Sequence, residues 1–62
     1  MIPRQFKDTR KALGLTQSQM AVYLRLNSGR AVRAYELGER EISGPISKLM
    51  EIYKAFPVMM QD

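Results

Sequence analysis

The residues of this 62-residue chain best suited to recognition chemistry are two arginines near its centre, Arg30 and Arg33. A guanidinium carries five N–H donors in a rigid fork, which matches the O6 and N7 acceptors of guanine and also the oxygens of a phosphate. The neighbouring small residues Gly29 and Ala34 leave space for a close backbone approach or for a thymine methyl group. The spacing predicts base contacts by Arg30, Arg33, Gly29 and Ala34, although both arginines could instead hold phosphates.

Catalytic chemistry is not expected. Cysteine and histidine are both absent, so the chain has no thiol nucleophile, no disulfide, no histidine base and none of the common zinc ligand sets. Its serines therefore have no histidine partner, and no Gly-rich phosphate motif or metal-ligand cluster is present. The sequence predicts a protein that is not an enzyme and that uses no cofactor and no metal.

Charge is distributed unevenly along the chain. Residues 1–34 hold seven basic side chains and one acidic one, whereas residues 35–62 hold three basic and five acidic side chains. The net charge of +4 and the sequence pI of about 9.9 favour an anionic partner. The concentration of the basic residues in one half of the chain favours nucleic acid as that partner. The alternative is a generically solvated basic surface.

Helix start and stop signals divide the chain into short helical segments. Thr16 followed by Gln19 forms a capping box, and Gly14 and Gly38 are typical residues at a helix end. Proline is favoured in the first turn of a helix. We expect four helices: from Pro3 to the stop at Gly14, from Thr16 to Leu24, from Gly29 to Leu37, and from Ser43-Gly44-Pro45 to Pro57.

No segment alternates like a strand, so the predicted fold class is all-α, with residues 1–62 forming one domain. No apolar run is long enough for a membrane span, and the N-terminus lacks the apolar stretch of a signal peptide, so we expect a cytoplasmic protein. The short helices must pack on one another to be stable. The expected core comprises Phe6, Leu13, Leu15, Met20, Ala21, Leu24, Val32, Tyr35, Ile46, Leu49 and Tyr53.

The central pair of predicted helices, separated by a tight turn, is typical of a helix-turn-helix. The segments Arg10–Ala21, with Leu13-Gly14-Leu15-Thr16-Gln17 inside it, and Tyr35–Glu41 resemble the Cro and phage repressor family of helix-turn-helix regulators. Ile42–Pro45 resembles the small phage and prophage members. Two features depart from the family pattern: Arg25 stands where a turn glycine is usual, and the turn at Asn27–Arg30 is about one residue longer than the commonest one.

The resemblance implies a compact four- to five-helix bundle of the lambda-repressor-like DNA-binding type with a central helix-turn-helix. It also implies that Arg10 and Glu36 form a partly buried structural ion pair and that Gln17 contacts a DNA phosphate. Free N–H groups at helix starts suit phosphate as well. The expected phosphate contacts are Gln17, Asn27, Ser28, Arg40, Ser43 and Gly44, although Asn27 and Ser28 can serve mainly as caps and Arg40 as a solvated loop charge.

Bulky apolar side chains continue beyond the last predicted helix, where so small a protein has little core left to receive them. Methionine is flexible and polarizable, which suits an interface. The expected dimer surface comprises Ile52, Phe56, Val58, Met59 and Met60, with Met50 as a further candidate and residues 57–62 as a short C-terminal dimerisation tail. The alternative is a tail that folds back on its own core.

The resulting hypothesis is a sequence-specific regulator that binds double-stranded DNA as a homodimer, on a two-fold symmetric operator, and represses by occupying it. It can be autoregulatory, and it needs no membrane and no small-molecule effector. The alternative is a protein-interaction module or an antitoxin-type protein that uses the bundle and the methionine-rich tail.

Overall fold

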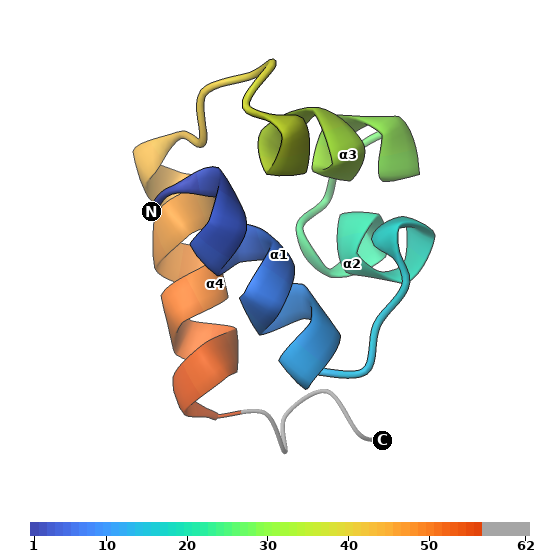
Figure 1. Ribbon diagram of the computed structural model, residues 1–62. Coiled ribbons are helices and arrows are strands. Elements are labelled where there is room, and N and C mark those ends of the chain that lie inside the picture. The colour runs from blue at the N-terminus through green and yellow to red at the C-terminus, as the bar shows by residue number, and fades with distance from the viewer. Residues whose placement is uncertain (57–62) are drawn as a thin grey trace.

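Four helices account for most of residues 1–56, the part of the chain that this computed structural model describes. They are α1 (Pro3–Ala12), α2 (Gln17–Tyr23), α3 (Gly29–Leu37) and α4 (Gly44–Ala55) (Figure 1). The described residues contain no strand, so the all-α prediction is confirmed, and each helix lies within one or two residues of its expected bounds. No helix in this range is long and apolar enough to cross a membrane.

Three of the four described helices, α2, α3 and α4, begin at side-chain caps. The Thr16 hydroxyl accepts a hydrogen bond from the Gln19 amide at 3.1 Å, and the Gln19 side chain accepts one from the Thr16 amide at 2.9 Å, which confirms the predicted capping box. Ser28 accepts from the Arg30 amide at 3.3 Å, and Ser43 is the N-cap of α4. Each cap satisfies backbone N–H groups that the first helical turn leaves without partners.

Left-handed backbone conformations follow three of the helices. Gly14 and Gly38 have φ of 73° and 76°, values that glycine adopts at no steric cost. Arg25, after α2, has φ of 59°, the one positive φ of a non-glycine residue in the described chain. An arginine in this conformation costs about 1–2 kcal/mol. The turn therefore keeps the backbone shape that favours glycine, although the sequence places an arginine there.

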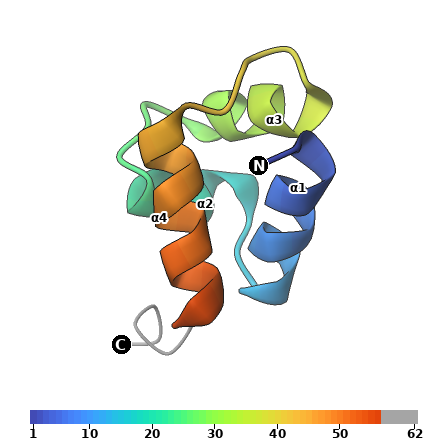
Figure 2. The same ribbon diagram turned by 90° about the vertical axis from the view of Figure 1, so that its left-hand side faces the viewer.

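The helices surround one apolar core. In both views α3 lies across one end of the molecule, with α2 packed against it and α1 next to α4 (Figures 1 and 2). The Phe6 ring of α1 meets the Tyr35 ring of α3 with their centroids 5.5 Å apart. The buried apolar side chains are Phe6, Met20, Ala21, Leu24, Val32, Tyr35 and Met50.

The expected core and the observed core differ at α4. Met50, a candidate for the dimer surface, is 0% exposed and belongs to the core, so that assignment was wrong. Apolar residues recur at helical spacing along this segment at Ile46, Leu49, Met50 and Tyr53, but periodicity alone does not say whether such a face meets the core or a partner. Five expected core residues are only partly buried and pack against the core from outside: Leu13, Leu15, Ile46, Leu49 and Tyr53.

Gly29 has a packing role that the sequence did not indicate. A Cβ atom placed on it would lie 3.0 Å from both the amide nitrogen and the hydroxyl of Ser18 on α2. Real Cβ atoms rarely approach other atoms so closely, and a backbone nitrogen in a helix cannot easily move away. The absence of a side chain at Gly29 therefore lets α3 pack closely on α2.

Replacing Gly29 with alanine should lower the free energy of unfolding by about 1–3 kcal/mol, because the added methyl group overlaps Ser18. The matched control is Gly44→Ala, since Gly44 also opens a helix and a Cβ there would meet nothing within 4 Å. Urea denaturation followed by circular dichroism measures both. Equal stability of the two variants would contradict the close α2 and α3 contact.

Candidate nucleic-acid interface

One face of α3 is open to solvent and carries its basic residues. Arg30 and Arg33 are both exposed, whereas Val32 and Tyr35 on the opposite face are buried. Ala34 is half-buried at the edge of the open face. A helix of nine residues is about 14 Å long, and with its side chains it is about as wide as the major groove of DNA. The arrangement can therefore present guanidinium donors to base edges or to phosphates.

Leu37 completes this face and was not among the residues predicted for the site. It is 55% exposed and follows Arg33 by four residues and Arg30 by seven, the spacing of one helix face. An apolar side chain in this position suits contact with a thymine methyl group. The helical spacing contained this signal, but leucine is usually assigned to a core.

Behind the open face, Arg10 of α1 and Glu36 of α3 form an ion pair. The Arg10 Nε donates to Glu36 Oε2 at 2.6 Å, and the Arg10 Nη2 donates to Oε1 at 3.3 Å. The side chains are only 11% and 4% exposed. The two residues that the resemblance pairs are thus brought together, with a bidentate geometry that fixes the angle between the guanidinium and the carboxylate.

The same pair also holds the start of α2. The Arg10 Nη1 donates to the Leu15 carbonyl at 2.8 Å, and the Gln17 side-chain amide donates to Glu36 Oε1 at 3.2 Å. Gln17, which was expected to contact a phosphate, is half-buried, and its side chain is hydrogen-bonded to Glu36. Its amide keeps one further N–H, because a primary amide has two donors.

Arg40 is held over the C-terminal end of α3. Its backbone amide and that of Glu39 both donate to the Ala34 carbonyl, at 3.3 and 2.9 Å. Its guanidinium carbon lies 5.7 Å from the centre of the Tyr35 ring, within the range of a cation–π contact. Arg40 is exposed, yet these contacts give it a defined place beside α3.

The predicted site residues fall into two groups. Asn27, Ser28, Arg30, Ala34 and Arg40 line one surface pocket of about 400 Å³, at the turn between α2 and α3. Gln17, Ser43 and Gly44 lie outside that pocket, as do Gly29 and Arg33. The pocket also includes Arg25, which was not predicted as a site residue and stands where the family pattern has a turn glycine.

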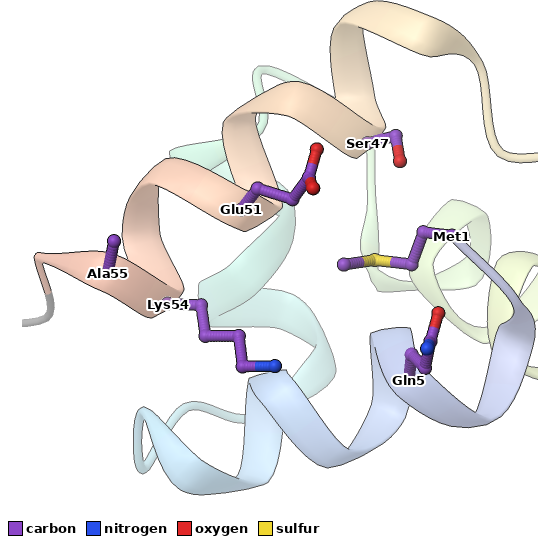
Figure 3. Close-up of a pocket in the computed structure, with 6 residues that line it drawn as sticks. All are labelled: Met1, Gln5, Ser47, Glu51, Lys54 and Ala55. Carbon is purple, nitrogen blue, oxygen red and sulfur yellow. The ribbon is translucent and has the colours of Figure 1, made fainter.

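A second pocket, of about 530 Å³, lies between α1 and α4 (Figure 3). Glu51 and Lys54 contribute one charge of each sign, and the Lys54 side chain extends toward α1. Its other lining residues are Met1, Gln5, Ser47 and Ala55. None of these lining residues is a predicted site residue.

The expected dimer surface is only partly within the described residues. Ile52 of α4 is 38% exposed, and Phe56, the C-cap residue four positions later, is 57% exposed. Val58, Met59 and Met60 lie outside the described residues. The exposed pair leaves an apolar strip at the C-terminal end of α4.

Comparison with known proteins adds no assignment to this geometry. No protein-family model, no curated protein and no solved structure matches the chain.

Breaking the Arg10 and Glu36 pair should be far more costly than breaking an exposed one. Arg10→Met or Glu36→Leu alone should lower the free energy of unfolding by about 3–5 kcal/mol, because each leaves a buried charge without its partner. The double variant should recover much of this loss. Arg4→Ala is the control, because it removes an exposed pair with Asp8 at 3.9 Å and should change stability little. Additive losses in the double variant, measured by urea denaturation, would contradict the coupling.

Proposed function

We propose that this chain is a sequence-specific DNA-binding regulator of the helix-turn-helix type, with α3 as the helix that enters the major groove. The observation that carries the proposal is the open face of α3, where Arg30, Arg33 and Leu37 are exposed on the opposite side from the core. On such a face one guanidinium can read the O6 and N7 atoms of guanine and the apolar group can contact a thymine methyl, while a second guanidinium can hold a phosphate.

The surroundings of α3 support the same function. Gly29 lets α3 pack tightly on α2, and the Arg10 and Glu36 pair ties α3 to α1. A recognition helix held on two sides presents its side chains in a fixed geometry, which reduces the entropy lost on binding. The pocket beside α3 adds basic groups at the edge of the groove, where phosphates lie.

The finer assignment is a bundle of the lambda-repressor-like type that acts as a dimeric repressor. Its support is the order of the helices, the resemblance of Arg10–Ala21 and Tyr35–Glu41, and the apolar strip formed by Ile52 and Phe56. Two such chains related by a two-fold axis present two recognition helices to half-sites about 34 Å apart. Repression then follows from occupancy, because a bound dimer covers the promoter.

Arg33→Ala should reduce affinity for the cognate DNA about tenfold or more, while binding to scrambled DNA of equal length falls much less. The measurement is fluorescence anisotropy with a duplex from upstream of the gene. Lys54→Ala is the control: it removes the same charge from the pocket between α1 and α4. The proposal is contradicted if the wild type binds the upstream and scrambled duplexes equally weakly, both at low and at physiological salt.

The dimer has its own test. Ile52→Lys and Phe56→Lys should each shift the sedimentation coefficient from that of a dimer to that of a monomer, because a lysine ammonium would be buried in the interface. Ile2→Lys is the matched control, since Ile2 is as exposed as Phe56, at 57%. If both α4 variants sediment like the wild type, the strip contacts something other than a second copy of this chain.

A further inference from the structure

The pocket at the turn between α2 and α3 is lined by arginines from three separate segments. Arg25 comes from the turn, Arg30 from the first turn of α3, and Arg40 from the loop after α3. The pocket has a volume of about 400 Å³, and the short side chains of Ala31 and Ala34 lie among its lining residues. Three long cationic side chains around small residues form a concave, positively charged surface.

No carboxylate in the described chain neutralises this pocket. The ion pairs among residues 1–56 join Arg4 to Asp8 and Arg10 to Glu36, so they use none of its arginines. Glu39 and Glu41 are the sequence neighbours of Arg40, but neither lines the pocket. Like charges gathered in this way repel one another, and an anion that enters the pocket removes that repulsion.

Two of the three arginines are positioned without a carboxylate partner. Arg40 is held by the Ala34 carbonyl and by the Tyr35 ring. Arg25 lines the pocket from a left-handed backbone conformation with φ of 59°, a strained conformation that glycine would relieve. The fold thus places a guanidinium at a turn where a glycine would be more stable.

We propose that this pocket binds a phosphate group. Guanidinium groups match phosphate oxygens in charge and in the geometry of their N–H donors. The inference rests on the proposed function in one respect, since the phosphate is then a phosphodiester of the DNA strand beside α3. It assigns Arg30 to the DNA backbone together with Arg25 and Arg40, and it leaves Arg33 and Leu37 to meet the bases.

Arg25→Gly tests this assignment without risk to the fold, because it removes one guanidinium and relieves the left-handed strain. Its denaturation midpoint should be at or above that of the wild type. In DNA titrations at several salt concentrations, the slope of log affinity against log salt should become shallower by about 0.9. When the salt is raised from 50 to 200 mM, the factor by which DNA affinity falls should therefore be about threefold smaller for the variant than for the wild type.

Matched variants separate this effect from a general loss of charge. Arg25→Lys keeps the cation and should keep most of the slope, and Lys54→Ala removes a cation from the other pocket and should leave the slope unchanged. Arg30→Ala should weaken binding to cognate and scrambled duplexes by the same factor. If wild-type protein binds DNA and Arg25→Gly gives the wild-type slope, the inference is wrong and the proposed function stands.

A second arm uses inorganic phosphate as the probe, with amide chemical shifts as the readout. If the wild type binds neither duplex, the proposed function fails. In that case, phosphate-induced changes in the amide chemical shifts of Ser28 and Arg30 that are absent in Arg25→Gly identify the pocket as a site for free phosphate. Absence of those shifts, in a protein that also binds no DNA, overturns the inference.

Discussion

The bidentate contact between Arg10 and Glu36 is the interaction on which the rest of this structure depends. It joins α1 to α3, and through the Leu15 carbonyl and Gln17 it also fixes the start of α2. The chain has no cysteine, and its core in the described residues comprises seven buried apolar side chains. So small a core leaves a narrow margin of stability. A buried charge pair orients three helices in a way that apolar contacts, which have little directional preference, cannot.

The helices were predictable because their boundaries are local. Caps and glycines act within one turn of the chain, so Thr16, Gln19 and Gly38 specify where helices begin and end without reference to the rest of the fold. Arg25 shows the limit of such rules, since the tertiary structure imposes a left-handed conformation on a residue that disfavours it. The burial of Met50 also depends on contacts distant in sequence, and periodicity does not reveal them.

The candidate site also has features that the sequence predicts and features that depend on the tertiary structure. The exposure of Arg30 and Arg33 follows from the period of α3, because residues opposite Val32 and Tyr35 must face solvent. That Arg25 and Arg40 line the same pocket does not follow from any helical spacing, because the two residues are fifteen positions apart in the sequence. Their proximity to one pocket depends on how the loop after α3 returns to the Ala34 carbonyl.

The division of α3 into a buried and an open face has an evolutionary consequence. Side chains at positions 30, 33 and 37 make few intramolecular contacts, so substitutions there change stability little. Gly29, Val32, Tyr35 and Glu36 are constrained, because packing or the ion pair fixes each of them. A lineage can therefore change what this helix recognises by mutating only its outer residues, while selection for folding preserves the inner ones.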